Sequence, residues 1–290
     1  MPAEKYRIFI DATADFPAAL RQRVGLLKMQ IAFGGQAMEY AADWDQRRLD
    51  AFYARLKAGE MPATSQISPF AYEQAFGKAL AAGEDILYLC FSSGLSNSIA
   101  SAQVAISALS QRFPQRRVAL FDTRSATYAQ GMLLQKAVAN LDQGMSIDEN
   151  LADLERERGQ IACWFTVSDL MYLRHGGRVS AAAALIGTTL RIMPILRIDE
   201  AGKLPVVDKV QGRKAAIRAL VRRFQATADR PDEQVVTIIH CAAEEEARLL
   251  ESMVRKAVPQ VGGTHIGGLG PVIGAHTGPG TLALLFKERA

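Results

Sequence analysis

The alternation of short apolar runs with amphipathic segments constrains the fold of this chain more than any other feature. In the first half, strand-like runs at residues 6–10, 85–91 and 118–121 alternate with segments of helical spacing, such as 69–82 and 126–142. The run at 85–91 is almost entirely apolar, as in a strand that is buried on both faces. This strand–helix rhythm predicts a mostly parallel sheet that is flanked by helices.

The second half has a different pattern. A D-E-A-G turn follows the strand-like run at 194–198 and predicts a hairpin with residues 204–209. Helical segments at 214–224 and 244–257 flank a further strand-like run at 235–240. Such a mixture is typical of an α+β domain with a mixed sheet.

The length and the change of pattern together predict two domains. A chain of 290 residues is longer than one typical domain. We place the boundary near residues 158–160, so that residues 1–159 form an N-terminal α/β domain and residues 160–290 a C-terminal α+β domain. The whole chain is therefore predicted to belong to the α/β class.

The charge of the chain excludes a typical nucleic-acid binder. The formal net charge is +4, from 34 basic and 30 acidic residues, and no basic run is interleaved with aromatic residues. The densest basic stretch, residues 213–223, has helical spacing, which is typical of a solvated helix face or of a docking surface for an acidic partner.

The cysteines, histidines and N-terminus indicate a cytoplasmic protein without a metal. Cys90, Cys163 and Cys241 each lie beside an apolar run, which predicts buried thiols in a reducing compartment. The four histidines show no spacing that is typical of a metal site. The first 16 residues do not form a signal peptide, and no segment is long enough to span a membrane.

Two segments in the first half are rich in hydrogen-bond donors. Residues 64–69, T-S-Q-I-S-P, place three hydroxyl groups before a helix, where an anion or an ordinary helix cap is expected. Residues 92–98, S-S-G-L-S-N-S, follow a buried strand and open a helix, at the edge of a parallel sheet where ligands bind. The second segment is not a phosphate-binding loop, because no Gly-Lys-Ser/Thr follows, and an ordinary serine-rich turn is its alternative.

Two segments in the second half are rich in glycine. Arg178 lies in G-G-R-V-S at 176–180. Its guanidinium either pairs with a carboxylate for structural reasons or binds a ligand or a phosphate. His276 lies within six glycines and two prolines at 267–280, where it is either structural or a donor to a carboxylate. A serine hydrolase built from Ser93, His276 and an acid such as Asp11 or Asp122 is a further, less favoured interpretation.

Taken together and in this order, these segments resemble the DegV family. Each motif alone is weak, but their joint order is specific and spans nearly the whole chain. The matching motifs are I-D-A-T-A-D at 10–15, T-S-Q-I-S-P at 64–69, S-S-G-L-S at 92–96, F-D-T at 121–123, G-G-R-V-S at 176–180, P-I-L at 194–196, K-V-Q-G-R-K at 209–214 and G-P-V-I-G-A-H-T-G-P-G at 270–280.

The resemblance implies a carrier that performs no chemistry alone and needs no cofactor. It implies a long-chain fatty acid in an apolar tunnel between the domains, with the carboxylate held at the domain interface. It also implies a separate ATP-dependent fatty-acid kinase subunit as partner, a role in phospholipid metabolism, and allows transient membrane contact. A lipid-sensing regulatory module and an acyl-group enzyme in its own right are the alternatives.

The resemblance also assigns roles to residues. It implies ligand binding by Thr64, Ser65, Ser93, Gly94, His276 and Thr277, and a partner-facing role for Arg178.

Some positions depart from the family pattern. Asn97 and Ser98 replace a glycine and a threonine, Met193 replaces a lysine, and Gln211 replaces an arginine that is associated with the kinase-facing surface. The ligand-binding motifs are thus intact, whereas the partner surface differs.

Overall fold

The computed structural model describes residues 6–178 and 192–289, which form two compact units. Unit 1 comprises Met1–Ile31, Ala37–Asp43 and Thr64–Gly159, and unit 2 comprises Ala32–Gln36, Trp44–Ala63 and Gln160–Ala290. Residues 159 and 160 belong to different units. Residues 32–36 and 44–63 also belong to unit 2, although the sequence pattern places them in the first domain.

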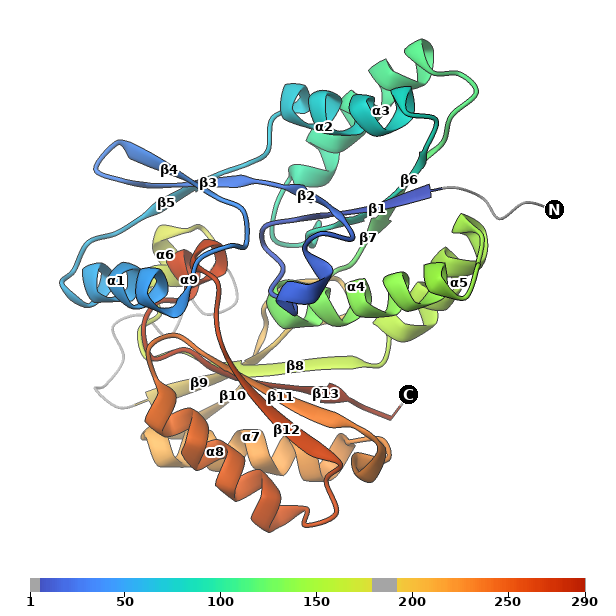
Figure 1. Cartoon of the computed structure of the whole chain (residues 1–290). Helices are drawn as coiled ribbons and strands as arrows, with labels where there is room; N and C mark the ends of the chain where they lie inside the picture. Colours follow the sequence, from blue (N-terminus) through green and yellow to red (C-terminus); the bar gives the residue numbers. More distant parts are fainter. Residues whose placement is uncertain (1–5, 179–191, 290) are drawn as a thin grey trace. The chain divides into compact units, whose positions relative to one another are not determined.

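Unit 1 is built around a parallel sheet of four strands in the order β2-β1-β6-β7. Helices α2 and α3 cover one face of this sheet, and α4 and α5 cover the other (Figure 1). The predicted parallel sheet flanked by helices is therefore confirmed. The elements are β1 (Tyr6–Asp11), η1 (Ala18–Leu20), β2 (Gly25–Leu27), α2 (Pro69–Ala81), β6 (Asp85–Cys90), α3 (Ser98–Arg112), β7 (Val118–Asp122), α4 (Thr127–Asp142) and α5 (Ile147–Arg158).

Local sequence explains where these helices begin. Ser68 accepts a hydrogen bond from the Ala71 amide at 3.2 Å and caps α2, with Pro69 in the first turn. Ser146 and Glu149 form a reciprocal capping box at the start of α5. The apolar strand β6 then fits between the two helical layers, since Ile86 to Cys90 are all fully buried.

Unit 2 contains a mixed sheet of six strands in the order β10-β9-β8-β13-β11-β12. The pair β11–β12 is parallel and the other pairs are antiparallel, so the predicted mixed sheet and the hairpin formed by β9 and β10 are confirmed. Helices α7 and α8 cover one face (Figure 1). The elements are α1 (Gln46–Lys57), β8 (Ile161–Thr166), α6 (Met171–His175), β9 (Ile192–Arg197), β10 (Val206–Gln211), α7 (Arg213–Thr227), η3 (Pro231–Glu233), β11 (Val235–His240), α8 (Glu244–Ala257), β12 (Gly263–Gly268), α9 (Pro271–Thr277) and β13 (Leu282–Lys287).

A third sheet lies in the segment where the chain passes from unit 1 to unit 2 and back. It has three strands in the order β4-β3-β5, which are β3 (Met29–Phe33), β4 (Gln36–Tyr40) and β5 (Ala63–Ser65). Thr64 and Ser65, which the resemblance assigns to the ligand, are the last two residues of β5.

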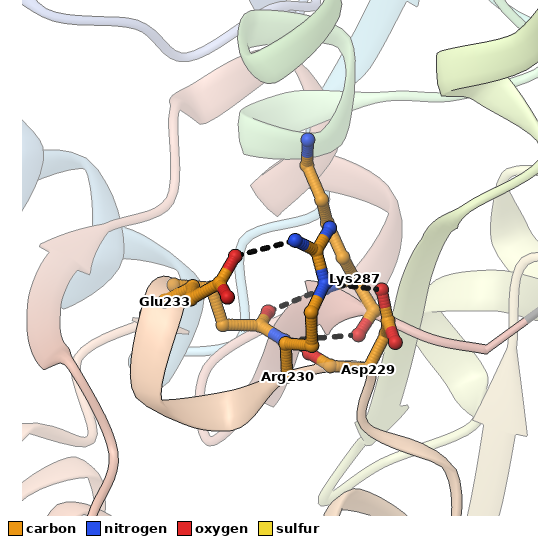
Figure 2. Close-up of polar contacts among 5 residues, drawn as sticks. Asp229, Arg230, Glu233 and Lys287 are labelled. Carbon is orange, nitrogen blue, oxygen red and sulfur yellow. Dashed lines mark hydrogen bonds and ion pairs between the residues drawn. The ribbon is translucent and has the colours of Figure 1, made fainter.

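The loop that leads into β11 is held by a compact set of polar contacts (Figure 2). Its backbone turns at Arg230, which has a positive φ of 34°, and the Asp229 amide donates to the Lys287 carbonyl of β13 at 2.9 Å. The Arg230 guanidinium pairs with Asp229 at 3.4 Å and with Glu233. These ion pairs are exposed and contribute little, so the loop is held mainly by its backbone bond to β13 and by the Gln234 side chain, which bonds both backbone groups of Lys287.

The structure also tests what the sequence indicates for single residue types. All three cysteines are buried, as predicted. Lys214, Arg218 and Arg222 lie exposed on α7, as expected both for a solvated helix face and for a docking surface. Among the described residues, no helix combines the length and the apolar character that crossing a membrane requires.

Candidate functional site

The carboxyl edge of the unit 1 sheet carries a buried carboxylate at Asp11, the last residue of β1. The Asp11 side chain accepts hydrogen bonds from the Thr13 amide at 3.1 Å, the Tyr88 hydroxyl at 2.9 Å and the Phe91 amide at 2.9 Å. The Gln130 amide group of α4 adds a weaker bond at 3.4 Å. Neutral donors therefore balance a carboxylate that is only 1% exposed, and they fix the start of the serine-rich loop.

The serine-rich loop begins where β6 ends, and Ser93 is bound there to Asp122 of β7. The Ser93 hydroxyl donates to Asp122 Oδ2 at 2.6 Å, and the Ser93 amide donates to Oδ1 at 3.2 Å. The Arg124 amide donates to the same Oδ1 at 3.0 Å. Next to this pair, the Gly94 amide donates to the Ser92 hydroxyl at 3.1 Å. Ser93 itself is exposed within unit 1.

The structure places Thr64 and Ser65 on a different sheet from β6, the strand that precedes Ser93. Both lie on β5, where Ser65 is exposed and Thr64 is half-buried. The hydroxyl that caps α2 belongs to Ser68, so the ordinary capping role expected for this segment falls on that residue alone.

In unit 2, His276 lies in the last turn of α9 against the backbone of Gly176. A Cβ atom at Gly176 would lie 2.2 Å from His276 Nδ1, so only glycine allows this approach. Burial, as the largest cause, together with the charge of Arg178 and the neighbouring His175, lowers the pKa of His276 to about 4. The imidazole is therefore neutral near pH 7, with one nitrogen that donates and one that accepts.

Arg178 is close to the same glycine. Its guanidinium donates to the Gly176 carbonyl, and its positive charge is one cause of the lowered pKa of His276. The structure therefore brings Arg178 and His276 together around Gly176. Val179 and Ser180, which complete the G-G-R-V-S motif, lie outside the described residues, as does the helix expected at 181–185.

Thr277 points into unit 2 rather than outward. It is 6% exposed, and its hydroxyl donates to the Ile273 carbonyl at 3.3 Å and lies 3.8 Å from Cys241 Sγ. Gly278 follows with a φ of 75°, and a Cβ there would lie 2.2 Å from the ring of Tyr172. The glycine density around His276 therefore reflects close packing as well as turns.

Two tyrosine hydroxyls that bond α1 to other segments of unit 2 were not predicted from the sequence. The Tyr53 hydroxyl of α1 donates to the Leu269 carbonyl at 2.8 Å, and the Tyr172 hydroxyl of α6 donates to the Leu56 carbonyl at 2.9 Å. The sequence pairs Asp122 with Ser93 only as the acid of a triad, whereas in the structure Asp122 accepts the Ser93 hydroxyl directly. No spacing along the chain connects these pairs.

The arrangement around Ser93 does not favour a serine hydrolase. In a catalytic triad the serine proton is donated to an imidazole, which the acid then orients. Here the Ser93 proton is donated to the Asp122 carboxylate itself. Among the described residues, no group of histidine, cysteine or acidic side chains is arranged to hold a metal ion.

Comparison with known proteins agrees with this fold over the whole chain. A family model described as "Uncharacterised protein, DegV family" matches residues 5–289. The chain belongs to the DegV family. A DegV domain-containing protein of Clostridium perfringens is 36% identical over 284 residues, which cover 98% of this chain and 97% of that protein.

Solved structures of DegV proteins share the fold. A DegV family protein from Thermus thermophilus, described by its fatty acid binding, has a TM-score of 0.84 and 28% identity, and the match covers 98% of this chain and 100% of that one. A fatty acid binding DegV family protein from Streptococcus agalactiae has a TM-score of 0.85 and 27% identity, with 99% and 100% covered.

Proposed function

We propose that this chain binds a long-chain fatty acid and performs no chemistry alone. The observation that carries the proposal is the match to the Thermus thermophilus and Streptococcus agalactiae structures, both described as fatty acid binding, over at least 98% of this chain. The ligand-binding motifs of the family are also present here, from T-S-Q-I-S-P to G-A-H-T-G-P-G.

The energetics of such a ligand favour a carrier. Each buried methylene contributes roughly 0.8 kcal/mol, so a chain of about sixteen carbons gains at most about 12 kcal/mol before the entropy of binding is subtracted. The hydrocarbon tail therefore supplies most of the affinity, and the head group mainly orients the ligand. The apolar tunnel that would enclose the tail stays a prediction.

The head-group chemistry of each unit supports this role. Unit 1 offers hydroxyl groups at Thr64, Ser65 and Ser93, and unit 2 offers the neutral imidazole of His276. Neutral groups orient a carboxyl group without a tight ion pair, which suits a ligand that must later react. That residues of both units meet one carboxyl group stays a prediction.

We further propose that the chain presents the fatty acid to a separate ATP-dependent kinase subunit. The resemblance supports this role, and Arg178 is the candidate residue for that surface. Gln211, which is exposed on β10 where the family pattern has an arginine, favours the alternative of a lipid-sensing regulatory module.

Mass spectrometry of the denatured protein tests fatty-acid binding. We expect a co-purified long-chain fatty acid, or stoichiometric uptake of added fatty acid by the delipidated chain. Neither co-purified lipid nor uptake would overturn the proposed function. Acyl phosphate that forms only after a kinase subunit of the host is added supports the carrier, whereas turnover by the chain alone supports an acyl-group enzyme.

A further inference from the structure

The Ser93–Asp122 pair fixes the direction of a hydrogen bond at the proposed head-group site. An ionised carboxylate only accepts hydrogen bonds, so the 2.6 Å bond uses the one proton of the Ser93 hydroxyl. The other oxygen of Asp122 already accepts the amides of Ser93 and Arg124 at 3.2 and 3.0 Å. What Ser93 has left to offer a ligand is therefore a pair of electrons and not a proton.

The position of Asp122 is itself fixed from several sides. The Arg158 guanidinium of α5 donates to the Asp122 main-chain carbonyl at 2.7 Å, and the ring of Phe121 lies under that guanidinium at 5.2 Å. The carboxylate is thus held by the serine-rich loop and the Arg124 amide, while α5 holds the main chain of the same residue. Turning the Ser93 hydroxyl toward a ligand would leave a half-buried carboxylate oxygen without its partner.

We propose that Asp122 is a positioning residue that makes Ser93 a hydrogen-bond acceptor, so that the site selects a head group that donates. Given the proposed function, on which this inference rests, the fatty acid then meets Ser93 as a protonated carboxylic acid, whose hydroxyl donates to Ser93 Oγ. A head group that can only accept loses this bond and places its oxygen or methyl group against an acceptor that has no proton to donate.

Asp122→Asn reverses the polarity at nearly constant shape. The substituted side chain keeps one oxygen for the two backbone amides, while its NH₂ group replaces the oxygen that faces Ser93. That NH₂ group donates to Ser93 Oγ, which frees the serine proton for the ligand. The substitution therefore converts Ser93 from an acceptor to a donor without removing a side chain.

Three ligands with the same long chain and similar head-group shape test the inference. They are the carboxylic acid, the primary amide, which donates, and the methyl ketone, which only accepts. We expect the delipidated wild-type protein to bind the amide about tenfold more tightly than the ketone in calorimetric titrations, since one hydrogen bond to the head group is at stake. In Asp122→Asn the ratio of the affinity for the amide to the affinity for the ketone should fall to about one or below.

Ser93→Ala, alone and with Asp122→Asn, is the matched control. Without the hydroxyl the amide-to-ketone ratio should be close to one whichever residue occupies position 122. Equal binding of amide and ketone by the wild-type protein would overturn the inference, even if Asp122→Asn does not fold. An unchanged preference for the amide in a folded Asp122→Asn protein would overturn it as well.

The carboxylic acid separates this test from that of the proposed function. If the wild-type protein binds the acid but does not distinguish amide from ketone, fatty-acid binding stands and the role of Asp122 is rejected. If it binds none of the three ligands, the proposed function fails, and the inference fails with it.

Discussion

The absence of a side chain at Gly176 leaves the space that the His276 imidazole occupies. The imidazole lies where a methyl group at residue 176 would be, 2.2 Å from that Cβ position, and burial keeps it neutral. The φ of Gly176 is −72°, which any residue adopts, so the glycine is required for space and not for conformation.

Gly176→Ala should therefore displace His276. We expect binding of a long-chain fatty acid to weaken about tenfold, because the displaced imidazole no longer presents its nitrogen in the same place. Gly77→Ala is the matched control, since its Cβ would meet only a leucine methyl group at 3.6 Å. Equal affinity of the two variants in titrations with a fluorescent fatty acid would argue against a head-group role for His276.

The lowered pKa of His276 predicts a pH dependence of stability. The pKa is about 6.5 in the unfolded chain and about 4 in the folded protein, so the unfolded state binds more protons between these values. Stability should thus fall as the pH decreases from 6.5 to 4, by about 2 kcal/mol after allowance for solvent access. His276→Gln should lose less stability than the wild type over this range in urea denaturation, whereas parallel curves would contradict the assignment.

At the scale of elements, the Asp11 carboxylate joins the ends of two strands and a helix. It binds the Thr13 amide after β1, the Phe91 amide after β6 and Gln130 of α4. Buried hydrogen-bonded groups of this kind are sensitive to loss of one partner, because the others are then left unsatisfied.

Asp11→Asn should destabilise unit 1 and loosen the serine-rich loop. One carboxylate oxygen becomes an NH₂ group, which cannot accept from the Phe91 amide or the Tyr88 hydroxyl, and we expect a loss of about 2–4 kcal/mol. Hydrogen exchange at residues 91–98 should speed up more than exchange in α5. Asp142→Asn, in an exposed pair with Arg23, is the control and should leave the unfolding midpoint almost unchanged.

Local sequence patterns predict the helices and strands, whereas the orientations of the site side chains depend on contacts between residues that are far apart in sequence. The parallel sheet, the β9–β10 hairpin and the cap of α2 by Ser68 all follow from periodicity, turn residues or neighbours in sequence. The direction of the Ser93 hydroxyl depends on Asp122, which is 29 residues away. The inward orientation of Thr277 depends on Cys241, and no local pattern announces either pair.

The whole molecule should respond to its proposed ligand through mass action. A ligand that binds only the folded state stabilises it by about 2.7 kcal/mol at one hundred times its Kd. Delipidated protein should therefore unfold at a lower temperature, and a long-chain fatty acid should restore the midpoint. A short-chain acid with the same carboxyl group should not, because the hydrocarbon tail supplies the affinity. Equal effects of both acids in thermal unfolding would contradict this prediction.

The position of α1 has a consequence for how the polypeptide is made. Its buried residues Phe52, Tyr53 and Leu56 belong to unit 2, and the Tyr53 hydroxyl reaches a carbonyl 216 residues further on. During synthesis, α1 leaves the ribosome long before α9, so its apolar face lacks this partner until α9 has been made. Contacts so distant in sequence close slowly and leave nascent intermediates prone to aggregate. We therefore expect the chain to need chaperones during synthesis. Fragments that stop before α9 should be poorly soluble.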